Sequence, residues 1–143
     1  MKAVHILLVE DNEGDIVLTT EALEESRIIN TVSVARDGRE ALDYIFGRGK
    51  FAEAQRPDLI LLDINLPLKN GHEILQEVKS DDKVKRIPVI MLTTSSSERD
   101  ISLSYQYHAN CYISKPVEIN QFIEAIASIE NFWLNIVSLP SAG

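Results

Sequence analysis

Acidic side chains, a hydroxyl and an amine each follow an apolar run at separate points of this sequence. Glu10 and Asp11 come directly after "HILLV", Asp63 ends "LILLD", Thr93 ends "VIMLT" and Lys115 follows "CYIS". Carboxylate oxygens bind hard divalent cations, and a carboxylate can also attack phosphorus as a nucleophile. A hydroxyl and an ammonium group can hold the oxygens of a phosphoryl group. If the fold brings these residues together, they form a phosphoryl-transfer site.

The elements that must position these residues alternate between strands and helices. Apolar runs predict strands at 4–9, 31–35, 57–65, 87–96 and 111–116. Helical spacing of apolar residues predicts helices at 14–26, 37–47, 72–80, 97–107 and 118–137. Continuous apolar strands are typical of a parallel sheet that is covered on both faces. We therefore expect one doubly wound α/β domain over residues 1–143.

The first predicted helix carries apolar residues that we expect to form its buried stripe. These are Ile16, Leu18, Ala22 and Leu23. In the last predicted helix the corresponding stripe is Phe122, Ile126, Ile129, Trp133 and Ile136. Both helices are thus expected to pack on the sheet.

In doubly wound sheets, ligands bind outside the carboxyl ends of the strands. The residues after each predicted strand, Thr94 included, would then face one crevice. Three carboxylates in such a place repel one another by several kcal/mol, and Lys115 offsets only one of the charges. The remaining charge favours Mg²⁺, which keeps part of its water shell and pairs with phosphate oxygens. Asp63 would be the nucleophile, and a backbone N–H near Thr94 would help Thr93 and Lys115 to hold the phosphoryl oxygens.

The composition excludes several other classes of function. The chain has 14 Lys and Arg against 22 Asp and Glu, a net charge of −8, which opposes nucleic acid and anionic membrane as non-specific partners. Cys111 is the single cysteine, so no intramolecular disulfide can form, which favours a reducing compartment. No apolar run approaches the roughly 20 residues of a membrane span. We expect a cytoplasmic protein.

Four segments resemble the receiver domains of two-component response regulators. They are "VEDN", "LLDINLPLKNG", "PVIMLTTSS" and "CYISKP", and the resemblance extends over almost the whole chain. Asp63 and Thr93 are 30 residues apart, and Thr93 and Lys115 are 22 apart, separations similar to those of receivers. The resemblance implies a flavodoxin-like fold of five parallel strands in the order 2-1-3-4-5.

The resemblance also implies a role for each site residue. Asp63 would be the phosphoacceptor, and Thr93 and Lys115 would contact the phosphoryl group. Mg²⁺ would be served by Glu10, Asp11, Asp63 and the backbone carbonyl of Asn65. Glu10 stands where many receivers have aspartate, so its longer side chain can reach the metal through water, and its direct ligation is left open.

A switch and an output surface are implied as well. On phosphorylation the Thr93 hydroxyl would move inward and Tyr112 would rotate into the space it leaves. The output surface would combine the helix at 97–107, the strand at 111–116 and the last helix, and a homodimer could form through this face. The Lys115–Pro116 bond is expected to be cis. Thr94 is bulkier than the alanine or glycine common at its position, and we hypothesise that it shields the acyl phosphate from water.

A narrower resemblance concerns the kinase. The segments "EDNEGD", "TTSSSERDI", "YHANCYISKPV" and "IENFWL" resemble the stand-alone receivers paired with bacterial phytochrome-type sensor kinases, which implies a light-regulated histidine kinase as phosphodonor. Only 28 residues follow Lys115, so we expect no output domain and a signal that leaves by protein contact. The interface candidates are Tyr112 and, in the last helix, Phe132, Trp133, Leu134 and Val137. For the apolar residues of the last helix, partner or homodimer contact is weighed against a local cap.

Other functions are weaker. An aspartyl-nucleophile phosphatase similar to the haloacid dehalogenases needs its nucleophile on the first strand and an acid two residues later, whereas position 65 is Asn. A flavodoxin-like cofactor carrier needs a loop rich in Ser, Thr and Gly where this chain has "EDNEGD". A phosphorelay intermediate and an unphosphorylated scaffold receiver both stay open.

Overall fold

The structure is a computed structural model and describes residues 3–26, 28–93 and 111–127. Its elements, in chain order, are β1 (Val4–Val9), α1 (Glu13–Glu25), β2 (Asn30–Ala35), α2 (Gly38–Phe46), the short 3₁₀ helix η1 (Gly49–Phe51), β3 (Leu59–Asp63), α3 (Gly71–Lys79), β4 (Val89–Thr93), β5 (Cys111–Ser114) and α5 (Ile119–Ala127). The helix expected at 97–107 and the part of the last helix beyond residue 127 lie outside the described residues.

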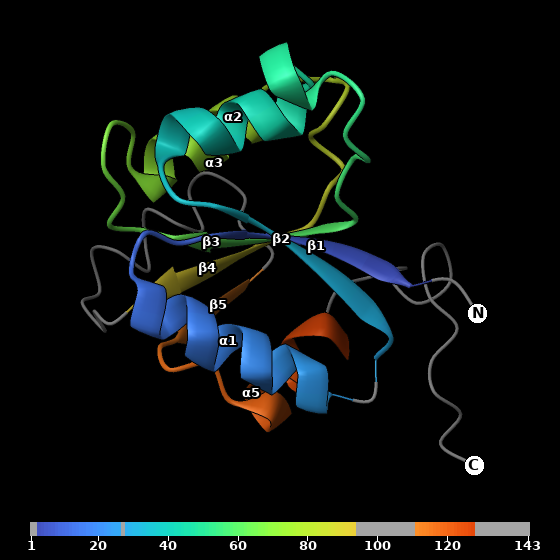
Figure 1. Cartoon of the computed structure of the whole chain (residues 1–143), viewed down its shortest axis with the longest axis vertical. Coiled ribbons are helices and arrows are strands. Elements are labelled where there is room, and N and C mark those ends of the chain that lie inside the picture. Colours follow the sequence, from blue (N-terminus) through green and yellow to red (C-terminus); the bar gives the residue numbers. More distant parts are fainter. Residues whose placement is uncertain (1–2, 27, 94–110, 128–143) are drawn as a thin grey trace.

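The five strands form one sheet in the order β2-β1-β3-β4-β5. Every neighbouring pair is parallel. Figure 1 shows α1 and α5 on one face of this sheet and α2 and α3 on the other. The prediction of a doubly wound, flavodoxin-like fold is therefore confirmed.

Each face of the sheet has its own apolar core. Along β1, Ile6 and Leu8 belong to the core beneath α1 and α5, together with Phe122. The alternate residues Leu7 and Val9 belong to the core beneath α2 and α3. Side chains of a strand point alternately to its two faces, so a strand covered on both faces has to be apolar at every position, as β1, β3 and β4 nearly are.

One expected core residue of α1 is exposed instead. Ile16, Thr19 and Leu23 are the buried residues of this helix, whereas Leu18 is 49% exposed and its neighbour Val17 is 52% exposed. Successive residues of a helix are about 100° apart, so Leu18 lies almost opposite Ile16. Assigning Leu18 to the buried stripe was wrong, because the small hydroxyl residue Thr19 takes that place.

Side-chain caps start the helices close to the carboxyl edge of the sheet. The Asn12 side chain accepts a hydrogen bond from the Asp15 backbone N–H and begins α1. Asp37 begins α2 in the same way, and Asn70 begins α3 with a capping box. Each cap satisfies backbone donors that a helix start leaves unpaired. Among the described residues, no helix is both long and apolar enough to cross a membrane.

Candidate functional site

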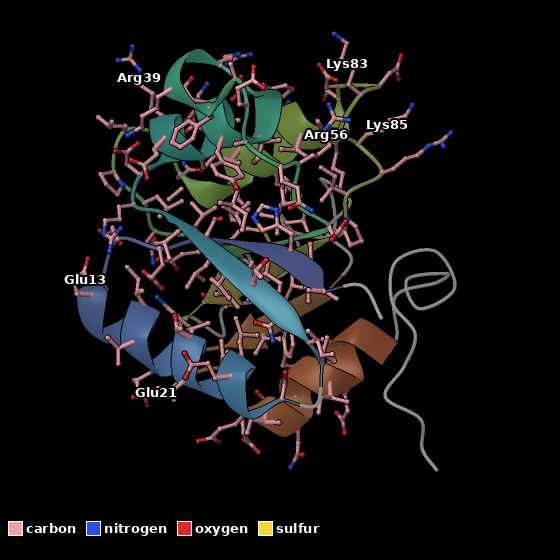
Figure 2. The ribbon with its side chains drawn as sticks, turned by 45° about the vertical axis from the view of Figure 1, so that its right-hand side comes forward. Glu13, Glu21, Arg39, Arg56, Lys83 and Lys85 are labelled. Carbon is pink, nitrogen blue, oxygen red and sulfur yellow. The ribbon has the colours of Figure 1, made fainter. Side chains whose placement is uncertain are left out.

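The predicted site residues meet at the carboxyl edge of the sheet. Glu10 and Asp11 follow β1, Asp63 is the last residue of β3, Thr93 is the last residue of β4 and Lys115 follows β5. Figure 2 labels Glu13 at the start of α1, which marks this edge. The parallel strands carry these residues to one place because all their carboxyl ends lie on the same side.

The basic run at 79–86 does not belong to this site. Figure 2 shows Lys83 and Lys85, with Arg56, at the opposite side of the molecule from Glu13. Lys85 is paired there with Asp82 across an exposed surface. Lys79 differs from the rest of the run, because its half-buried Nζ donates to the carbonyls of Lys85 and Ile87 at 3.0 and 2.8 Å.

Three carboxylates form the centre of the site. Glu10, Asp11 and Asp63 each offer an oxygen, and these oxygens lie within 4.8 Å of one another. Glu10 is completely buried and Asp63 is 3% exposed, whereas Asp11 is exposed to solvent. The site thus has a buried floor and one solvent-facing carboxylate.

The Lys115 ammonium contacts two of these carboxylates and a further one from α1. Its Nζ lies 2.7 Å from Glu10 Oε1, 3.0 Å from Asp15 Oδ2 and 3.3 Å from Asp63 Oδ1. The Lys115 side chain is only 8% exposed. With Asp15 included, the site holds four carboxylates and one ammonium group, so it is more negative than the sequence analysis counted.

Asp15 is the site residue that the sequence analysis missed. It lies in the first turn of α1, where an acidic residue is usually explained by its favourable interaction with the helix dipole. One signal was available, because Asp15 comes only four residues after Asp11, in the first turn that follows the Asn12 cap. That signal could not name Lys115 as its partner, since the two residues are 100 positions apart.

Burial and like charge change the acidity of Asp63. Burial, and after it the neighbouring Glu10 carboxylate, raise the pKa of Asp63 to about 7, and Lys115 opposes this only in part. For Lys115, burial lowers the pKa, but the carboxylates of Glu10, Asp15 and Asp63 outweigh burial and raise it above its ordinary value. Lys115 is therefore a cation at neutral pH, while Asp63 shares its surroundings with a second acid.

Both oxygens of Glu10 already have partners. Oε1 accepts from Lys115, and Oε2 accepts from the backbone N–H groups of Asp11 and Asn12, at 3.1 and 3.3 Å. A metal bound directly to Glu10 would have to share these oxygens. In a contact through water, which the longer side chain of Glu10 led us to consider, a metal-bound water would donate a hydrogen bond to one of these oxygens.

The residues present fit a hard divalent cation. All three clustered ligands are carboxylates, which suit Mg²⁺ and similar ions. The raised pKa of Asp63 comes in part from Glu10, and a cation between the carboxylates would relieve this repulsion. Asp11 and Asp63 could hold the ion directly, with Glu10 beside them.

Gly71 lets α3 begin directly against Asp63. A Cβ at Gly71 would lie 2.4 Å from the Asp63 carbonyl oxygen and 2.8 Å from Ile64 Cα. The Gly71 N–H donates to the Ile64 carbonyl at 2.8 Å. Only glycine permits this approach, so Gly71 helps to set where Asp63 ends β3.

The remaining predicted residues differ in what the structure shows of them. Thr93 is buried, and its carbonyl accepts from the Lys115 backbone N–H at 2.8 Å. Tyr112 packs in part against the core beneath α2 and α3, Asn65 is exposed, and the Lys115–Pro116 peptide bond is cis. The candidates outside the described residues are Thr94, Phe132, Trp133, Leu134 and Val137.

Comparison with known proteins agrees with this geometry. Residues 6–127 match the response regulator receiver domain. The chain is 44% identical over 137 residues to the response regulator Rcp1 of Synechocystis sp., covering 96% of this chain and 93% of Rcp1. The phosphorylated cyanobacterial phytochrome response regulator RcpA has a similar structure, with a TM-score of 0.78 and 50% identity over 97% of this chain and 99% of RcpA. The Mn²⁺-bound form of Rcp1 gives a TM-score of 0.77 and 43% identity over 96% of this chain and 99% of that one.

The family match covers the sheet except for the first two residues of β1, and it covers every described site residue. The relatives share both sequence and fold with this chain. The chain therefore belongs to the response regulator receiver domain family and is related to the phytochrome response regulators.

Proposed function

We propose that this protein accepts a phosphoryl group on Asp63 from a sensor histidine kinase, in a Mg²⁺-dependent reaction. One observation carries the proposal: Asp63 is a buried carboxylate that contacts the Lys115 ammonium and also belongs to the cluster of possible metal ligands. A nucleophile, a fixed cation and a metal site at one point are the parts that phosphoryl transfer needs.

The transfer itself follows from these groups. An oxygen of ionised Asp63 forms a new P–O bond as the P–N bond to the kinase histidine breaks. Lys115 neutralises charge on the phosphoryl oxygens, and the buried Thr93 hydroxyl is proposed to hold another of them. Bound Mg²⁺ would supply further charge neutralisation between the carboxylates and the phosphoryl group.

A phytochrome-type kinase is the proposed phosphodonor. RcpA is described as a phosphorylated cyanobacterial phytochrome response regulator, and another similar structure is the bacteriophytochrome response regulator AtBRR, 46% identical with a TM-score of 0.81. These likenesses extend over at least nine-tenths of this chain, which supports the same class of partner here.

We further propose that the signal leaves through the face that includes β5 and α5. A cavity of about 390 Å³ lies on this face, lined among the described residues by Tyr112, Ile113, Ser114, Gln121, Glu124 and Ala125. Tyr112 comes three residues before Lys115, so a change at Lys115 can reach the cavity along β5. The contact is proposed to be with a partner protein or a second copy of the chain.

Phosphorylation from a small-molecule donor tests the proposal. The protein is incubated with acetyl phosphate or phosphoramidate, with Mg²⁺ and with EDTA, and phosphoprotein is measured by phosphate-affinity gel and intact mass. We expect one added phosphoryl group with Mg²⁺, almost none with EDTA, and none in Asp63→Asn.

The matched control is Asp82→Asn. Its side chain is 91% exposed and pairs with Lys85 at the opposite edge, so this variant is expected to react like the wild type. Labelling that persists in Asp63→Asn, or its absence from the wild type with both donors, would contradict the proposed function.

A further inference from the structure

We propose that Asp15 is a positioning residue for phosphoryl transfer, whose carboxylate holds the Lys115 ammonium so that one N–H stays directed at Asp63. The inference rests on the proposed function and adds a residue of α1 to the site. Asp15 is not among the clustered metal ligands, so its effect would pass through Lys115.

The first step concerns the donors of Lys115. A lysine ammonium group has three N–H donors, and three carboxylates lie around this one, from Glu10, Asp15 and Asp63. Because the Lys115 side chain is 8% exposed, water has little access to it. Each N–H can therefore face one carboxylate.

The second step concerns which of these contacts can change. Glu10 is held in place, since its other oxygen accepts two backbone N–H groups. Asp15 is held by its own backbone N–H, which donates to the Asn12 cap at 2.9 Å. Only Asp63 changes chemically on phosphorylation, so the N–H that faces it is the donor available to an incoming phosphoryl oxygen.

The third step is what the loss of Asp15 would do. With Glu10 as the remaining fixed partner, the ammonium group could rotate about that single contact and present its N–H groups in other directions. A group held in the reacting orientation lowers the barrier, and its displacement slows the reaction even when binding is unchanged.

Glu13 provides the comparison that separates an effect through Lys115 from a general effect of negative charge at the start of α1. Glu13 lies in the same first turn of α1 and has the same charge, but it pairs with Arg36 at an exposed surface. A general effect of charge at the start of α1 would appear in both Glu13→Gln and Asp15→Asn. An effect through Lys115 would appear only in Asp15→Asn.

The experiment measures the rate of phosphorylation by phosphoramidate at saturating Mg²⁺ over a range of donor concentrations. We expect Asp15→Asn to lower the maximal rate about tenfold, with little change in the donor concentration that gives half of it. Glu13→Gln should stay within about twofold of the wild type. In a Lys115→Ala background, adding Asp15→Asn should slow the reaction no further, because the residue it positions is gone.

A second readout does not depend on the reaction. In protein labelled with ¹⁵N-lysine, an ammonium group held by acceptors and shielded from water gives a resolved N–H signal, and Lys115→Ala identifies the signal of Lys115. We expect this signal in the wild type and in Glu13→Gln, and its loss or strong broadening in Asp15→Asn.

The outcomes separate this inference from the proposed function. A wild type that takes no phosphoryl group overturns both. A reactive wild type with an equally fast Asp15→Asn variant overturns the positioning role alone. The positioning role is also overturned if the Asp15→Asn variant keeps the Lys115 signal. It is overturned as well if adding Asp15→Asn slows the Lys115→Ala variant by the same factor as it slows the wild type.

Discussion

At the scale of single residues, the main feature of the site is that the Asp63 carboxyl group is buried beside the Glu10 carboxylate. Burial and the Glu10 carboxylate raise the pKa of Asp63 to about 7, against an ordinary value of 3.8. The folded protein therefore binds a proton that the unfolded chain releases when the pH lies between these values. This carboxyl group makes the metal-free protein most stable at low pH, and that contribution is lost as the pH rises through about 7.

Asp63→Asn is expected to remove this loss of stability. In EDTA at pH 8 the variant should be more stable than the wild type by on the order of 3 kcal/mol, because its side chain carries no charge against Glu10. At pH 5 the difference should be smaller, since Asp63 is then largely protonated in the folded wild type. Urea denaturation at both pH values measures it.

Asp82→Asn serves as the comparison, because it makes the same chemical change at a side chain that is 91% exposed. Its stability relative to the wild type should not show this difference between pH 5 and pH 8. If Asp63→Asn differs from the wild type by the same amount at both pH values, the acidity assigned to Asp63 is wrong.

At the scale of the elements, the helix starts fix the edge on which the site is built. α1 brings Asp15 to Lys115, and α3 begins against the backbone of Asp63. The second contact depends on the absence of a side chain at Gly71, because the atoms that a Cβ would meet belong to the backbone and cannot move away. The start of α3 and the end of β3 are thus coupled.

Gly71→Ala is expected to destabilise the protein by about 1–3 kcal/mol, as overpacking of a buried contact does, and to slow phosphorylation of Asp63 by shifting it. Thermal unfolding and the phosphoramidate assay measure the two effects. Gly14→Ala is the control, because the nearest atom to its added Cβ is the Asn12 side-chain oxygen at 3.2 Å, and its stability should change by no more than about 1 kcal/mol. Equal stability of Gly71→Ala and the wild type would show that α3 can retreat without cost.

At the scale of the whole molecule, the site joins segments from both ends of the described chain. Glu10 and Lys115, 105 positions apart, form a buried ion pair at 2.7 Å. Asp63 comes between them from the central strand β3. A cation bound among Glu10, Asp11 and Asp63 would bind the folded protein far better than the unfolded chain, so it should stabilise the fold as a unit.

Mg²⁺ is expected to raise the melting temperature, and to raise it more at pH 8 than at pH 5.5. The reason is the pKa of Asp63 near 7, since protons compete with the metal for this ligand at the lower pH. At a concentration 100 times the dissociation constant, the gain at pH 8 should be about 2.7 kcal/mol. Calorimetry with Mg²⁺ or EDTA measures it.

Asp11→Asn should lose most of the Mg²⁺ effect, because Asp11 belongs to the carboxylate group. Glu21→Gln, a change on α1 outside that group, should keep it. Equal Mg²⁺ effects at the two pH values would argue that Asp63 is not among the ligands.

The sequence by itself determined the fold class and most of the site. Apolar runs and helix caps are local patterns, and the rule that parallel strands end on one edge was enough to bring Asp11, Asp63, Thr93 and Lys115 together. The same local patterns gave a wrong prediction for Leu18. It is apolar and lies two positions after the buried Ile16, but this spacing places it on the opposite side of the helix, where it is exposed.

Only the tertiary structure decided which charged groups contact one another and how these contacts change their pKa values. The contact of Asp15 with Lys115, the partners of both Glu10 oxygens and the raised pKa of Asp63 depend on distances between residues far apart in the chain and on the loss of water around them. Both quantities come from packing, and electrostatic energy depends steeply on both. A strand end shows where a carboxylate lies, whereas its neighbours and its burial set its charge.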